Sequence, residues 1–164
     1  MDAAYNLARW LTRNDQDARD VVQEAMLRAY RFLDGLRGEA RPWLLALVRN
    51  AAMTWLKQNR PAELVGGDAA ATAAAALLVD ETTPETLALR ALDRRLVNEA
   101  LAALPVQFRE ALILRELEEL PYRDIARITD SPIGTVMSRL ARARRLLADS
   151  LRTIARASAP KVRE

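Results

Sequence analysis

The sequence concentrates the residues that could bind a polyanion near its C-terminal end. Between Ser131 and Arg156, six arginines accompany a single acid, Asp149, which gives this stretch a net charge of +5 (six minus one). In the whole chain, Lys57 and Lys161 are the only lysines among 25 basic residues. Arginine carries a planar fork of donors that fits phosphate groups and the edges of bases, so this composition favours a nucleic acid as the ligand.

The sequence lacks cysteine and histidine, two residue types on which covalent and metal-assisted catalysis often depend. Their absence excludes a thiol nucleophile, an imidazole base, a disulfide framework and the usual zinc sites. The sequence also contains no glycine-rich phosphate loop and no nucleophile–base pair. Glu116, Glu118 and Glu119 are interpreted as a solvated helix end, because no histidine accompanies them. We therefore predict that the protein is not an enzyme and has no metal site and no cofactor.

A helix that begins near Ile133 is expected to position the arginines. Ser131 is suited to cap its first turn, and Pro132 fits the first helical position. The predicted buried stripe consists of apolar residues at spacings of three and four, namely Ile133, Val136, Leu140, Ala143 and Leu147. The rest of the circumference carries the candidate DNA-contacting residues Thr135, Ser138, Arg139, Arg142, Arg144 and Arg145. Those nearest the start of the helix would meet base edges in a major groove.

A short helix predicted over residues 122–128 and a turn at 129–132 precede this basic helix. A short helix, a brief turn and a longer basic helix follow one another in a helix-turn-helix. Ala126 is expected where the two helices pack closely, with Ile125 and Val136 in the shared core. The alternative is a plain amphipathic surface helix whose charged face is only solvated.

The chain as a whole is predicted to be all-α, because alanine and leucine are abundant and aromatic residues are few. Apolar residues at helical spacing predict further helices over 2–12 and 15–33, a third from Trp43 that is complete by residue 60, and two more over 85–103 and 106–117.

The sequence changes character between Pro61 and Pro84, where two adjacent glycines and an alanine-rich tract show little amphipathic order. Net charge changes in parallel: +3 over residues 1–60 (ten minus seven), −4 over 61–92 (one minus five) and +4 over 93–164 (fourteen minus ten). We predict two small helical domains joined by a flexible linker, with boundaries at 1–60, 61–92, 93–156 and a tail at 157–164. A fourth core helix over 69–79 is the alternative for the tract.

Three motifs together resemble the extracytoplasmic-function sigma factors of bacterial RNA polymerase. They are Asp17 to Glu24 (DARDVVQE), Trp43-Leu44 through Arg49-Asn50, and Pro132 to Val136 (PIGTV) followed by Ser138-Arg139. Their order and spacing are similar to those of the family's region 2 and region 4, over about residues 2–60 and 93–152. The resemblance implies a region 2 three-helix bundle and a region 4 helix-turn-helix.

The resemblance implies two roles for region 2. Asp20, Gln23 and Glu24 match the residues by which such proteins dock on the clamp of core RNA polymerase; from the residues alone, they would be the solvated face of a helix. The segment from Gly38 into the third helix resembles the part that captures an unstacked base of the −10 element. Separated strands need basic and polar side chains that hold them, and the residues available for this are Arg37, Arg41, Arg49 and Asn50.

Region 4 of the family reads the −35 element as duplex DNA, which assigns that role to the candidates between Thr135 and Arg145. The implied function is a sigma factor that directs promoter-specific transcription initiation. Its expected partners are core RNA polymerase (clamp and flap surfaces), promoter DNA and an anti-sigma factor. The alternatives are a stand-alone helix-turn-helix repressor or activator, and a helical adaptor without a DNA function.

The sequence departs from common relatives of this family at two places. The loop between Gly38 and Trp43 is about two residues shorter, which bears on base capture at the −10 element. Met137 stands where many relatives carry lysine or arginine, so an apolar contact, such as one to a thymine methyl group, would replace a charged one.

The N-terminus lacks a basic start followed by an apolar core, and the longest apolar stretch, over 69–79, is too short to cross a bilayer. Neither secretion nor membrane insertion is predicted. The lack of cysteine is compatible with a reducing compartment, and we predict a cytoplasmic protein.

Overall fold

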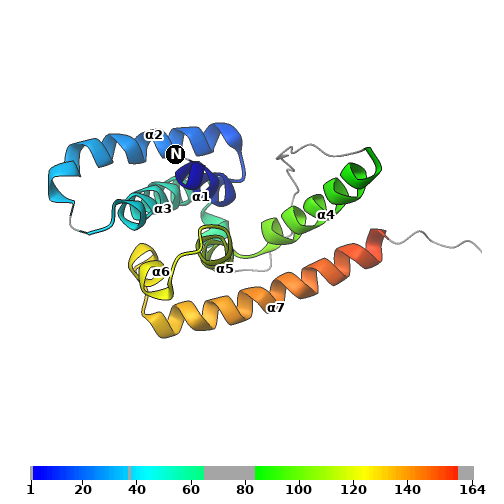
Figure 1. Ribbon diagram of the computed structural model, residues 1–164. Coiled ribbons are helices and arrows are strands. Elements are labelled where there is room, and N and C mark those ends of the chain that lie inside the picture. The colour runs from blue at the N-terminus through cyan, green and yellow to red at the C-terminus, as the bar shows by residue number, and fades with distance from the viewer. Residues whose placement is uncertain (1, 37, 65–83, 159–164) are drawn as a thin grey trace, which may run out of the picture.

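The computed structural model describes residues 2–36, 38–64 and 84–158 (Figure 1). Every regular element within these ranges is helical, which confirms the all-α prediction. The elements are α1 (Asp2–Thr12), α2 (Asp15–Phe32), the 3₁₀ turn η1 (Leu33–Gly35), α3 (Ala40–Asn59), the 3₁₀ turn η2 (Pro61–Leu64), α4 (Pro84–Ala103), α5 (Val106–Leu112), the π-helical turn η3 (Ile113–Leu117), α6 (Tyr122–Thr129) and α7 (Ile133–Ser158). The tract at 69–79 lies outside the described residues. None of the described helices is long and apolar enough to cross a membrane.

Helices α1, α2 and α3 pack against one another as a three-helix bundle (Figure 1). Leu7 and Leu11 of α1 and Leu45, Val48 and Leu56 of α3 are buried between them. These residues recur three, four or eight positions apart, so each helix presents one apolar face to the others. The bundle is the first of two helical halves of the chain.

The corner between α1 and α2 is held by polar side chains. The Asn14 side-chain oxygen accepts hydrogen bonds from the backbone N–H groups of Gln16 and Asp17, at 2.8 and 3.1 Å, and so caps α2. The carboxylate of Asp15 accepts from Arg9 and from the Tyr5 hydroxyl. These bonds lower the pKa of Asp15, the contact with Arg9 being the larger cause.

In the second half, α6 and α7 form the predicted helix-turn-helix. Asp130 ends α6 in a left-handed conformation (φ 48°), and the Ser131 N–H donates to the Ala126 carbonyl at 3.0 Å. Ile125 and Val136 are buried between the helices, as the sequence predicted, and Ala126 is half-buried beside them. Helix α7 begins at Ile133, as predicted, and extends along the lower edge of the molecule (Figure 1).

The helix predicted over residues 106–117 is not a single regular helix. It is α-helical to Leu112 and then widens into the π-helical turn η3, where the Glu118 N–H donates to the Ile113 carbonyl at 3.0 Å. Ile113, Leu114 and Glu118 are all buried. The wider turn thus returns Glu118 to the interior, where a regular helical end would have left it in water.

The two halves are packed together. Helix α3 contacts α6, α1 contacts α5, and one continuous apolar core contains Leu45 and Leu56 from the first half and Ile113 and Leu114 from the second. The first four residues of the predicted linker form η2, which lies against both α3 and α5. The pattern of helices in the sequence did not predict this docking.

Replacing Asn14 with alanine is expected to lower the stability of the protein by about 1 kcal/mol, because two N–H groups at the start of α2 lose their acceptor. Thermal unfolding followed by circular dichroism should show a midpoint about 2–4 °C lower. Asn14→Asp keeps the acceptor and is expected to unfold within about 1 °C of the parent protein. An alanine variant as stable as the aspartate variant would show that this cap contributes little.

Candidate nucleic-acid and polymerase surfaces

Most arginines predicted to face DNA on α7 are engaged with other parts of the protein. The half-buried Arg139 donates through Nη1 to the Ser131 hydroxyl at 3.0 Å. The guanidinium of Arg142 lies over the Phe108 ring, 5.4 Å from its centroid. Arg144 donates to Glu116 at 2.7 Å, and this carboxylate raises the pKa of Arg144.

The remaining candidates on α7 differ in exposure. Ser138 and Arg145 are exposed, and Thr135 is half-buried. The Ser138 hydroxyl donates to the Thr135 carbonyl at 3.0 Å. Ile133, predicted on the buried stripe, is 49% exposed, and that prediction was wrong. Val136 is the first residue of α7 that is buried, so the helix enters the core only at the end of its first turn.

The arginines predicted to hold separated DNA strands also have acidic partners, and these come from the other half of the chain. Arg49 on α3 forms two hydrogen bonds to Glu110 on α5, at 3.0 and 3.3 Å. Arg41, at the start of α3, donates to Glu118 at 2.8 Å. Arg37 lies outside the described residues, and Asn50 is exposed on α3.

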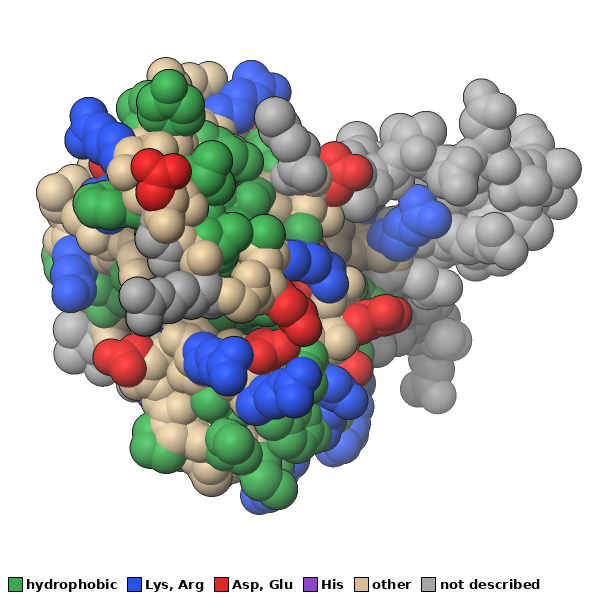
Figure 2. All heavy atoms as spheres, turned by 60° about the vertical axis from the view of Figure 1, so that its left-hand side comes forward, with side chains coloured by type: hydrophobic (Ala, Val, Ile, Leu, Met, Phe, Trp, Pro, Cys, Tyr) green, Lys and Arg blue, Asp and Glu red, His purple; other side chains and the backbone are tan. Residues whose placement is uncertain are grey.

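The carboxylates of Glu110 and Glu118 therefore bind guanidinium groups that are suited to phosphate. The Glu110 side chain is 2% exposed and that of Glu118 is 5% exposed. The interpretation of the acidic corner as a solvated helix end was wrong for Glu118, which is buried, while Glu116 and Glu119 are exposed. Charged groups at such depth are retained when they are paired. On the face in Figure 2, basic and acidic side chains accordingly lie beside one another across the middle of the molecule.

Asp20, Gln23 and Glu24 share one exposed face of α2, since they are three and four residues apart. Glu24 accepts a hydrogen bond from Arg28 at 2.8 Å, and Asp20 accepts one from Gln16 at 3.4 Å. Both contacts stay within α2. We call the arrangement in which the two halves are packed together the closed form. The α2 face with Asp20, Gln23 and Glu24 is exposed in this closed form.

Comparison with protein families assigns both halves. The family model described as Sigma-70 region 2 matches residues 1–61, and the one described as Sigma-70, region 4 matches residues 94–147. An ECF RNA polymerase sigma-E factor of Haemophilus influenzae is 37% identical over 154 residues, which cover 90% of this chain and 80% of that protein. The chain belongs to the extracytoplasmic-function sigma factor family. The sigma-E factor of Escherichia coli is 36% identical over 146 residues, covering 85% of this chain and 76% of that protein.

The fold of this sigma factor is similar to that of the sigma factor RpoE of Bartonella quintana, solved in complex with the anti-sigma factor NepR. The TM-score is 0.72 and the identity 27%, over 92% of this chain and 90% of that one. A match of this extent includes both region 2 and region 4.

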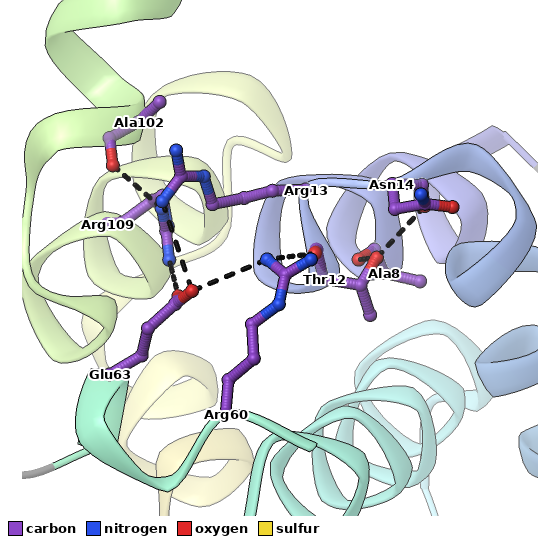
Figure 3. A network of polar contacts seen from close by, with 8 residues as sticks. All are labelled: Ala8, Thr12, Arg13, Asn14, Arg60, Glu63, Ala102 and Arg109. Atoms are coloured by element: carbon purple, nitrogen blue, oxygen red, sulfur yellow. Dashed lines mark hydrogen bonds and ion pairs between the residues drawn. The ribbon is translucent and has the colours of Figure 1, made fainter. Parts of the chain in front are cut away.

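A second contact between the regions of this sigma factor centres on Glu63 of η2 (Figure 3). Its carboxylate lies 3.3 Å from Arg109 of α5, 3.4 Å from Arg60 and 3.9 Å from Arg13. Arg109 also donates to the Ala102 carbonyl at 3.1 Å. The sequence did not reveal this network, because its members come from four separated segments and form no motif.

Arg109 is the most buried charge in this network, with 1% of its side chain exposed. Burial lowers its pKa to about 10, and the attraction of Glu63 opposes the shift, so the guanidinium remains charged at neutral pH. Among the described residues, its Nε is a buried polar atom without a hydrogen-bond partner. Glu63 is thus the acidic partner that stabilises the charged form of Arg109.

Glu63→Ala is expected to destabilise the sigma factor by about 3 kcal/mol, because it leaves Arg109 buried without a counter-charge. This is at the low end of the range for buried pairs, since Glu63 itself is 24% exposed. Denaturation by urea measures the change.

The matched control is Asp149→Ala, which removes an ion pair with Arg152 whose side chains are 60% and 68% exposed. It is expected to change the stability by less than about 1 kcal/mol. If Glu63→Ala were as mild as this surface variant, the network around Arg109 would not stabilise the docked regions.

Proposed function

We propose that this protein binds core RNA polymerase and directs it to promoters, with region 2 opening the −10 element and region 4 reading the −35 element. The observation that carries the proposal is the presence of both sigma regions, in order, on one chain that aligns with sigma-E factors over most of its length. In this role the protein is not itself a catalyst, because the polymerase forms the phosphodiester bonds. It acts where bacterial transcription takes place, in the cytoplasm.

For region 2, the proposed polymerase contact is the exposed face of α2 with Asp20, Gln23 and Glu24. The three side chains are uncovered even while the two regions are docked. Their hydrogen bonds reach no further than one helical turn, so a partner can replace these bonds without unfolding any part of the bundle. Region 4 would use a separate surface on the polymerase flap.

The proposed −10 contacts are Arg37, Arg41, Arg49 and Asn50. Melting requires side chains that stabilise separated, negatively charged strands, and the guanidinium groups of Arg41 and Arg49 already bind carboxylates in a geometry suited to phosphate. Asn50, exposed on the same helix, offers an amide for the edge of an unstacked base.

Promoter binding requires the two regions to separate. The elements at −10 and −35 are about 25 bp apart, or about 85 Å at roughly 3.4 Å per base pair. In the structure α3, which carries the −10 candidates, is packed against α6 of the helix-turn-helix. One molecule in this closed arrangement cannot contact both elements, so the closed form precedes promoter binding.

The closed form is also the one that we propose for capture by an anti-sigma factor. What supports this is the similarity to the Bartonella quintana sigma factor, whose two regions were solved with such a partner. A partner that binds across both regions would add to the contacts that already hold them together.

Reconstitution with core RNA polymerase tests the function. The mixture is expected to co-elute in gel filtration and to initiate transcription on linear genomic fragments, with transcript starts that share two upstream elements. Combined alanine substitutions at Asp20, Gln23 and Glu24 should reduce co-elution about tenfold or more, because these residues are exposed and carry the proposed contact. Their folding is checked by an unchanged thermal midpoint. Binding of DNA by the protein alone, with neither co-elution nor initiation, would instead identify a stand-alone repressor.

Loosening the closed form should expose the −10 surface. The double variant Glu110→Gln, Glu118→Gln removes both carboxylate charges that occupy Arg49 and Arg41. Its affinity for a single-stranded −10 oligonucleotide is expected to rise on the order of tenfold, which corresponds to about 1.4 kcal/mol of binding free energy. Fluorescence anisotropy measures the affinity.

Glu116→Gln is the control for this double variant, since Glu116 pairs with Arg144 of α7 and has no partner in region 2 among its described contacts. It should leave the affinity unchanged. Equal affinities for the parent and the double variant would mean that these ion pairs do not limit access to the strand.

A further inference from the structure

The start of α7 presents an apolar surface without charge. Ile133 is 49% exposed and Met137 is 53% exposed, one helical turn apart. The other exposed residues from Pro132 to Ala141 are Pro132, Gly134, Ser138 and Ala141, none of which is charged, and the exposed Arg142 follows them. Figure 2 shows hydrophobic side chains at the bottom of the molecule, where α7 lies, with basic side chains next to them.

The arginines nearest this surface are directed to protein partners. Arg139 is half-buried and bound to Ser131, and Arg142 lies over Phe108. A contact from either to a guanine edge would first require loss of these interactions. Exposed arginines flank the surface in sequence: Arg123 and Arg127 on α6 lie 3.8 and 3.7 Å from the Asp124 carboxylate with side chains 68% and 77% exposed, and Arg145 is exposed on α7.

In a helix-turn-helix, residues at the start of the second helix contact base edges, and the first helix crosses the phosphate backbone. In this geometry Arg123 and Arg127 of the first helix would meet phosphates, and Ile133 and Met137 at the start of the second helix would meet the bases. The major groove offers an aliphatic side chain one matching group, the C5-methyl of thymine. Four residues of helix rise about 6 Å, and two base-pair steps rise about 7 Å, so the spacing of the two side chains matches methyl groups two base-pair steps apart.

We propose that this protein discriminates its −35 element through thymine methyl groups held by Ile133 and Met137. The inference rests on the proposed function, since it concerns how region 4 reads promoter DNA. Phosphate contacts from the flanking arginines position the helix and carry no sequence information.

The test uses the assembled holoenzyme and a promoter identified from mapped transcript starts. Each thymine of the −35 element is replaced by deoxyuridine, which pairs identically and lacks only the methyl group. Relative initiation from competing thymine and deoxyuridine templates is expected to favour thymine about fourfold per contacted methyl, the factor that corresponds to burial of one methyl-sized group. Absence of initiation on every template would refute the proposed function itself.

Substitutions in α7 then show which side chain is responsible for the preference for thymine over deoxyuridine. Met137→Ala is expected to abolish the preference at one thymine and Ile133→Ala at another, while Met137→Leu should retain it. Leu117→Ala is the matched control: Leu117 is also 53% exposed but lies on η3, and its loss should leave every thymine preference intact. Arg145→Ala should weaken initiation on both templates equally, as expected for a phosphate contact.

Initiation that is equal on thymine and deoxyuridine templates would overturn the inference while leaving the sigma factor assignment in place. A preference that persists in both Ile133→Ala and Met137→Ala would also overturn it, because other residues would then read the methyl groups.

Discussion

The pairing of Arg49 with Glu110 joins α3 of region 2 to α5 of region 4 when the two regions are packed together. The Glu110 side chain is 2% exposed and that of Arg49 is 19% exposed, so neither charge can lose its partner without another ligand or water replacing it. An apolar contact of the same area would hold the two regions at least as well, because desolvation of a buried ion pair offsets much of its attraction. What the ion pair adds is reversibility: once separated, both side chains are compatible with water, and Arg49 is compatible with phosphate.

The network around Glu63 also contributes to the free energy that holds the two regions together. One carboxylate serves three arginines, and burial lowers the pKa of Arg109 to about 10, which shows that its charged form is held at a cost. If the two regions separate as proposed and water then reaches Arg109, part of the lost contact energy is recovered as hydration. The closed form is therefore held by many contacts but by a smaller net free energy than its buried area suggests. A polymerase and a promoter together can exceed such a difference, since binding at one site raises the effective concentration at the other.

The sequence predicted the helices and the helix-turn-helix because these depend on local spacing. Val136 and Leu140 are buried as their helical spacing required, and Asp130 and Ser131 fall in the turn.

The docking of the regions could not be predicted in this way. Arg49 and Glu110 are 61 residues apart and Arg41 and Glu118 are 77 apart, and an arginine that binds a carboxylate has the same local pattern as one that binds phosphate. The wrong interpretation of Glu118 has the same origin, since it depends on the widened turn η3, for which the apolar spacing carries no signal. Ile133 shows a related limit: periodicity identifies the apolar face of a helix, but the tertiary packing decides how much of that face is covered.

In the proposed readout, different parts of α7 contribute to affinity for DNA and to discrimination between DNA sequences. Its first six residues, Ile133 to Ser138, carry no charge and offer shape and apolar contact, while Arg139, Arg142 and Arg144 contact Ser131, Phe108 and Glu116. A helix with every arginine directed outward would bind any duplex through phosphates and would lose affinity steeply with salt, without gaining in choice of sequence. For a protein whose other region is anchored to a polymerase, tight independent binding by region 4 is unnecessary. With weak phosphate contacts and apolar contacts to the bases, region 4 dissociates quickly from a non-cognate sequence. The base sequence then determines where the polymerase is positioned.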